Sequence, residues 1–149
     1  MHIAQFNISK QLAPLDAPLM RDFVASLDRI NRLADSSDGF VWRLHDESGN
    51  ATAIRAFEDR SIIFNLSVWR SIDALWRFVY HTQHAHVLER RREWFAEMSV
   101  YNYVLWAIPE GHRPTVEEAK ARLRHLQEFG ETEYAFTFTR RLTNDVRDA

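Results

Sequence analysis

Apolar and polar residues alternate along four segments of the chain, and this pattern predicts four β-strands. In the first segment, residues 2–8, Phe6 falls on one face and Gln5 on the other. The remaining three segments are residues 40–45, 61–69 and 101–108. Shorter extended segments are expected at residues 53–57 and at 134–139, the latter as an edge strand or an arm.

Apolar residues recur at helical spacing in three other segments, which predicts three helices. The first follows the opening strand and is expected to stop at Gly39. The second covers residues 72–98, with a bend as an alternative near its middle. The third begins after Thr115, which forms a capping-box pattern with Glu118, and ends at Gly130.

The predicted elements follow one another in the order β-α-β-β-α-β, with an extra helix and strand at the C-terminal end. Two split β-α-β units in one antiparallel sheet are the ferredoxin-like arrangement, so we expect an α+β fold. A chain of 149 residues fits one domain. We place that domain at residues 1–142 and expect residues 143–149 to form a frayed tail.

The second face of this sheet is half polar. Alternation places Gln5, Asn7, Asn65, Ser67 and Trp69 opposite the apolar face. Such a face is too apolar for water and too polar for a dry core. Two copies meeting through it would form a dimeric α/β barrel with a partly wet interior, so we predict a homodimer. A monomer with a solvated sheet face is the alternative.

Composition narrows the function classes. The net charge of −2, with both signs interspersed, gives no basic field for nucleic acid. No segment has the roughly 20 apolar residues of a membrane span, so we expect no membrane partner. The absence of Cys excludes disulfides and thiolate chemistry, and without a signal-peptide pattern we expect a cytoplasmic protein. Five Trp and ten Phe favour a pocket for a hydrophobic small molecule.

The segment 72–98 carries candidate chemistry. If it is one continuous helix, a single stripe collects Trp76, Tyr80, His84, Val87, Arg91, Trp94 and Met98. In the functional interpretation His84 is a proton shuttle or ligand contact and Arg91 binds an anionic oxygen, so both are catalytic candidates. Alternatively, backbone carbonyls or a carboxylate such as Glu58 or Asp59 satisfy them structurally. A break near Thr82 would rotate His84 away from Trp76.

Other polar groups carry weaker signals. Only His81 and His84 of the nearby histidines share a helical face, so we expect no metal site. The run 90–92 is flanked by Glu residues and, apart from Arg91, indicates a charged solvent face. His112 and Arg113 follow the fourth strand, where they either reach a pocket mouth or simply form a turn.

Several segments resemble a bacterial family of uncharacterised proteins. They are HIAQFNI (2–8), GFVWRL (39–44), IRAF (54–57), SVW (67–69), FVYHTQHAHVLERRREWF (78–95) and PEGHRPTVEEAKARL (109–123). That family is grouped with antibiotic-biosynthesis-monooxygenase-like proteins of the dimeric α/β barrel superfamily. The resemblance places His84, Arg91, Trp94, His112 and Arg113 at matching positions. It implies cofactor-independent oxygenation, haem binding or isomerisation as the functions to consider.

Our leading hypothesis is a pocket protein that acts on an aromatic or otherwise hydrophobic molecule without a cofactor, as a monooxygenase or isomerase. His84 would be the base and Arg91 would stabilise an enolate or phenolate. Substrate contacts are assigned to Trp76, Tyr80, Trp94, Trp106, His112 and Arg113. The alternatives are a haem-binding protein and a non-catalytic dimeric module that binds a ligand or partner.

Overall fold

The structure is a computed structural model, and it describes residues 1–46, 49, 52, 54–82 and 84–141. The expected frayed tail, residues 143–149, lies outside the described residues, as does the start of the expected extended piece at Ala53. Within the described ranges, no helix combines the length and the apolar character needed to cross a membrane.

The four predicted strands are present and form one sheet. They are β1 (His2–Lys10), β2 (Phe40–Arg43), β3 (Ile62–Trp69) and β4 (Tyr103–Ile108). The sheet order is β2-β3-β1-β4, and every neighbouring pair is antiparallel. The β1–β3 pairing runs from Ile3 opposite Trp69 to Lys10 opposite Ile62, so both strands place the same alternation on each sheet face.

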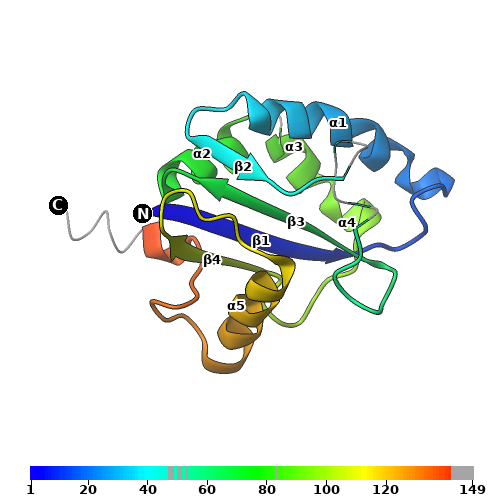
Figure 1. The fold of residues 1–149 in the computed structure, drawn as a ribbon. Helices are drawn as coiled ribbons and strands as arrows, with labels where there is room; N and C mark the ends of the chain where they lie inside the picture. The colour runs from blue at the N-terminus through cyan, green and yellow to red at the C-terminus, as the bar shows by residue number, and fades with distance from the viewer. Residues whose placement is uncertain (47–48, 50–51, 53, 83, 142–149) are drawn as a thin grey trace.

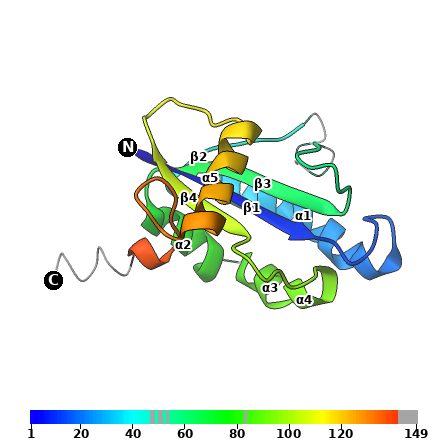
Figure 2. The same cartoon turned by 90° about the horizontal axis from the view of Figure 1, so that it is seen from below.

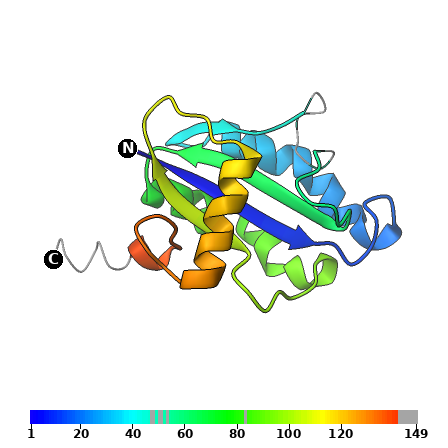
Figure 3. The same cartoon turned by 60° about the horizontal axis from the view of Figure 1, so that its bottom comes forward.

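Helices lie on both faces of the sheet. They are η1 (Pro18–Met20), α1 (Arg21–Asp35), α2 (Ile72–His81), α3 (His84–Glu89), α4 (Arg91–Trp94) and α5 (Val116–Phe129). Figure 1 and Figure 2 show α1 to α4 on one side, and Figure 3 shows α5 crossing the opposite side. The molecule is therefore a mixed α+β protein with helices above and below an antiparallel sheet.

The apolar sheet face packs under α5. Phe6 on β1 and Trp106 on β4 are fully buried there against Leu123 and Leu126 of α5. The predicted cap holds this helix, because the Thr115 hydroxyl accepts a hydrogen bond of 3.1 Å from the Glu118 backbone N–H. This side of the sheet is therefore a dry core.

The half-polar face is covered by the chain's own helices. Gln5 and Ser67 are buried beneath α1 and α2, where Trp69 stacks on Phe78 at 5.0 Å between ring centroids. The predicted dimer requires this face to be open to a second copy. Helices of the same chain cover the face, so it is not available as the predicted interface.

The predicted helix over residues 72–98 is three separate helices. Thr82 ends α2 in an extended conformation (φ −128°, ψ −174°), and its hydroxyl donates to the Phe78 carbonyl and accepts from the His84 N–H. Arg90 then separates α3 from α4. The single stripe expected from Trp76 to Met98 is therefore wrong, because a side chain competes with the backbone for the helical hydrogen bonds.

Two predicted extended segments also differ. Over residues 134–139 the chain makes only an isolated bridge, in which Phe136 and Leu105 exchange backbone hydrogen bonds of 2.8 and 2.9 Å. It then turns into a short helical turn at 139–141. The described residues 54–57 form bends and no strand. Gly39 (φ 83°) does not end α1, which stops at Asp35.

Candidate functional site

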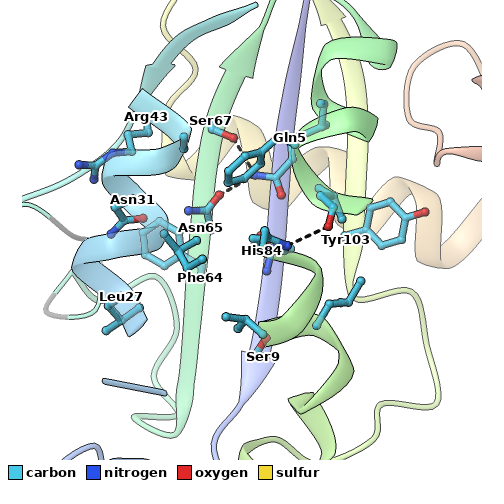
Figure 4. Close-up of a pocket in the computed structure, with 18 of the residues that line it drawn as sticks. Gln5, Ser9, Leu27, Asn31, Arg43, Phe64, Asn65, Ser67, His84 and Tyr103 are labelled. Atoms are coloured by element: carbon cyan, nitrogen blue, oxygen red, sulfur yellow. Dashed lines mark hydrogen bonds between the residues drawn. The ribbon is translucent and has the colours of Figure 1, made fainter. Parts of the chain in front are cut away.

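A cavity of about 330 Å³ lies between the half-polar sheet face and helices α1, α2 and α3. Figure 4 shows its floor on β1 and β3 and its sides on α1 and on the segment around His84. Its volume falls at the lower end of the range for small-molecule sites. We refer to this space as the cavity.

The floor of the cavity carries a connected polar group. The Gln5 amide, on β1, donates to Asn65 Oδ1 at 2.8 Å and to Ser67 Oγ at 3.0 Å, both on β3. The indole N–H of Trp69 also donates to Ser67 Oγ, at 3.0 Å. We call Gln5, Asn65 and Ser67 the polar strip. These bonds fix the orientation of each side chain in the floor.

The sides of the cavity are mostly apolar. They are formed by Phe23, Leu27 and Ile30 of α1, Leu75, Phe78 and Val79 of α2, Val87 and Leu88 of α3, and Tyr103 and Phe138. Burial raises the pKa of the Tyr103 phenol, which stays neutral and accepts a 3.3 Å hydrogen bond from the Phe138 N–H. Apolar sides above a polar floor suit a hydrophobic molecule with a few polar groups.

The described lining contains no carboxylate, although it contains two arginines and a histidine. Arg43 is neutralised from outside the cavity by Asp35, with N–O distances of 2.7 and 3.2 Å. Arg91 has no acidic partner among the described residues. The cavity therefore has an excess positive charge at Arg91, which favours an anionic group in a ligand or intermediate.

His84 lies at the start of α3 and faces the cavity (Figure 4). Its Nδ1 lies 3.4 Å from the Val79 carbonyl oxygen, and its ring lies 5.1 Å from that of Phe78. Burial lowers the pKa of His84 below its ordinary value, so the ring is neutral near pH 7. A carbonyl only accepts, so the proton of the neutral ring is on Nδ1, and Nε2 is left as an acceptor.

Arg91 differs from its two neighbours in its contacts. Arg90 binds Asp22 at 2.9 Å and Glu93 at 2.8 Å, and Arg92 binds Glu97 at 3.3 Å. These pairs are solvent-exposed, as predicted for the run 90–92. Arg91 is exposed as well, but it lines the cavity from the first position of α4.

The structure brings only some of the predicted site residues together. His84, Arg91 and Tyr80 line the cavity. Trp76 lies behind Tyr80, with 4.2 Å between ring centroids, and does not line the cavity. Trp94 is buried in a separate cluster against Phe23, at 5.6 Å between ring centroids. The break at Thr82 thus separates the two tryptophans that the continuous helix placed together.

The remaining three predicted site residues lie away from the cavity. Trp106 faces α5 on the opposite sheet face, where its indole N–H donates to Glu118 at 2.9 Å. His112 binds the same carboxylate at 2.7 Å. Arg113 lies over the ring of Trp42 at 5.9 Å. The structure thus groups these residues around α5.

Sequence reasoning did not assign the polar strip to a ligand site. The alternation had placed Gln5, Asn65 and Ser67 on one face, which is the signal that could have found them. That face was assigned to a dimer interface because strand periodicity does not show what covers a sheet. Tyr103 and Phe138 carried no such signal.

Metal binding receives no structural support from the described residues. Among them, no group of three or more His, Asp or Glu side chains is placed to hold a metal ion. His84 lies in the cavity beside apolar neighbours.

The fold and the cavity define a class: an α+β protein with a small-molecule-sized cavity between its sheet and its helices. The family model for a domain of unknown function, DUF3291, matches residues 2–149, so the chain belongs to the DUF3291 family. No curated protein and no solved structure matches the chain. The predicted membership of an uncharacterised family is therefore confirmed.

Proposed function

We propose that this protein binds a small hydrophobic, ring-containing molecule in the cavity and acts on it without a cofactor. His84 is the general base, and Arg91 stabilises the anion that forms. The observation that carries the proposal is a neutral His84 with a free Nε2 in a cavity that also holds the unpaired Arg91 and no described carboxylate. Both groups were catalytic candidates on sequence alone.

The proposed chemistry begins with a proton transfer. Nε2 of His84 removes a proton from an activated C–H or O–H of the bound molecule, and the Arg91 guanidinium offsets the resulting negative charge. In an oxygenase, the carbanion attacks O₂ directly. A ring CH₂ then becomes C=O, one oxygen atom is kept and the other leaves as water with the two hydrogens. In an isomerase, the same proton returns to a different carbon.

The test uses a polycyclic phenol that is easily deprotonated, 1,8-dihydroxyanthrone, as the probe. We expect oxygen uptake and conversion to the corresponding quinone, followed by absorbance and mass spectrometry. His84→Ala should lower the rate by about 100-fold or more, which is the usual contribution of a positioned base. Arg91→Ala should lower it by a similar factor.

Matched control variants exist beside each residue. His86→Ala changes an exposed histidine of α3, and Arg92→Ala changes an exposed arginine of α4, neither of which lines the cavity. Both should keep the wild-type rate. If His84→Ala and Arg91→Ala also keep it, the proposed roles are wrong.

Haem binding is the second candidate, and the free Nε2 of His84 is the observation that favours it. An imidazole nitrogen without a partner, in a cavity with mostly apolar sides, is a suitable axial ligand. Titration with haemin should then give a Soret band that His84→Ala removes. If the titration gives no Soret band of a protein-bound haem, this candidate is ruled out.

The ferredoxin-like fold, a homodimer, the monooxygenase-like resemblance and a cytoplasmic location also belong to this proposal. The antiparallel order β2-β3-β1-β4 supports the ferredoxin-like part. A non-catalytic ligand-binding module uses the same cavity. Mass spectrometry of incubated ligands separates it from an enzyme, because only an enzyme changes their mass or isomer.

A further inference from the structure

We infer that the polar strip of Gln5, Asn65 and Ser67 recognises a neutral group that both donates and accepts hydrogen bonds, of the carboxamide type. The inference rests on the proposed function, since it names the class of molecule that the cavity holds. It assigns a recognition subsite on the floor of the cavity (Figure 4), separate in role from His84 and Arg91.

The hydrogen bonds within the polar strip use some of its donor and acceptor groups and leave others free. Gln5 Nε2 donates both of its N–H groups, to Asn65 Oδ1 and to Ser67 Oγ. Ser67 Oγ accepts a second bond from the Trp69 indole, a group that can only donate. Both lone pairs of the serine oxygen are therefore occupied.

Three groups remain unused. Gln5 Oε1 and Asn65 Nδ2 have no partner among the described residues, and neither atom is sealed away from solvent. The Ser67 hydroxyl still has its own proton to donate. All three side chains line the cavity. The floor therefore presents an acceptor beside two donors.

The presence of both an acceptor and a donor in the floor does not depend on which way round the two amides lie. If the oxygen and nitrogen of both amides are exchanged, Asn65 donates to Gln5, and Ser67 donates to Gln5 as well. One amide acceptor and one amide donor are then still free. A hydrogen-bonded pair of amides thus always offers the cavity both kinds of group.

The complement of such a floor is a group with adjacent acceptor and donor atoms. A carboxylate only accepts, so it would face the free acceptor of the amide pair. A ketone likewise leaves that acceptor unpaired, and an ammonium leaves the donors unpaired. Because Gln5 and Ser67 are buried beside Trp69, an unpaired group there costs more than at a surface.

The test compares three naphthalene probes that share one apolar body. They are 2-naphthamide, which donates and accepts, 2-acetonaphthone, which only accepts, and 2-naphthoate, which is anionic. Isothermal titration calorimetry on the full chain should show 2-naphthamide binding about tenfold more tightly than 2-acetonaphthone. The affinity for 2-naphthoate should depend on Arg91 instead.

Variants test the polar strip and Arg91 separately. Gln5→Met keeps the length of the side chain and should remove the tenfold preference, whereas Arg91→Ala should weaken only 2-naphthoate. Asn65→Asp keeps the shape and still accepts from Gln5, but it replaces the free donor, so it should weaken 2-naphthamide. Circular dichroism checks that each variant folds. Gln127→Met, on the opposite side of the sheet, is the matched control and should change no affinity.

The outcomes separate this inference from the proposed function. Equal binding of 2-naphthamide and 2-acetonaphthone, or a preference that survives both Gln5→Met and Asn65→Asp, overturns the inference and leaves the cavity's role intact. Failure of all three probes to bind counts against the proposed function itself, and the inference falls with it.

Discussion

A single hydrogen bond at His84 decides which of its ring nitrogens is available to a ligand. The Val79 carbonyl, 3.4 Å from Nδ1, comes from the last turns of α2, on the other side of the break at Thr82. The interruption of the helix therefore positions the imidazole. In an unbroken helix the Val79 carbonyl would instead accept a backbone N–H.

Burial of His84 makes the stability of the protein depend on pH. Its folded pKa lies below the ordinary value of 6.5, so the unfolded chain binds this proton more readily than the folded chain. The stability contributed by neutral His84 is fully present above about pH 6.5 and is lost as the pH falls through the folded pKa. We expect urea unfolding to show this loss as the pH is lowered below about 6.5.

The comparison variant for this prediction is His84→Gln, which stays uncharged over the whole range. It should reduce the loss of unfolding free energy on acidification relative to wild type. An identical loss in both proteins would contradict the assignment of a lowered pKa to His84.

At the scale of elements, the hydroxyl of Thr82 holds the junction between α2 and α3. It donates to the Phe78 carbonyl and accepts from the His84 N–H at 3.2 Å. Thr82→Ala should cost about 1 kcal/mol of unfolding free energy, as does the loss of a helix cap. Because His84 would be less firmly placed, turnover of the anthrone probe should fall as well.

Thr82→Ser tests whether the hydroxyl causes both effects. Serine keeps the oxygen and removes only the methyl group, so it should restore most of the stability and turnover lost in Thr82→Ala. If serine and alanine behave alike, the hydroxyl does not position His84. Unfolding curves and initial rates on the same preparations give both readouts.

The elements differ in how well local pattern predicts them. Strands β1, β3 and β4 were predicted within about two residues, because a buried face imposes alternation of period two. Helix α5 was predicted at both ends by Thr115 and Gly130. The break at Thr82 was raised only as an alternative, because threonine hydroxyls bind carbonyls in helices and at helix ends alike.

The candidate site was only partly predictable, because local sequence pattern does not show which elements pack together. His84 and Arg91 were found because a charged or titratable residue on an apolar helix face is unusual. Trp94 and Trp106 were placed with them by helical and strand phase, but phase is lost across a break and does not say which helix covers a face. Which helix covers which sheet face depends on the packing of residues that are far apart in the sequence.

At the scale of the whole molecule, one helix covers the second sheet face incompletely. A helix is about 10 Å wide, whereas four strands span roughly 15 Å or more. Helix α5 packs on β4 and β1, and towards β2 the core on this face is bordered by partly buried residues, including Trp42, Ile54 and Phe57. We propose this border as the contact of a homodimer, in place of the half-polar face through which the sequence predicted one.

Native mass spectrometry tests that prediction on a chain of 17.6 kDa. We expect the mass of two chains, reverting to one in Trp42→Asp, because a charge buried at an interface is costly. Val24→Asp is the control, since Val24 is exposed on α1 at the other side of the sheet and should leave the dimer intact. A wild-type protein that carries the mass of a single chain contradicts the prediction.

The short bridge between Leu105 and Phe136 has a consequence for how the protein is made. It holds the segment that places Phe138 against Tyr103, with 5.6 Å between ring centroids, and so completes one side of the cavity. Chains emerge from the ribosome N-terminus first. The floor, Gln5 to Trp69, is therefore synthesised well before Phe138, and a nascent chain has a sheet before it has a closed cavity. We therefore expect the cavity to hold a ligand only after Phe138 has been synthesised.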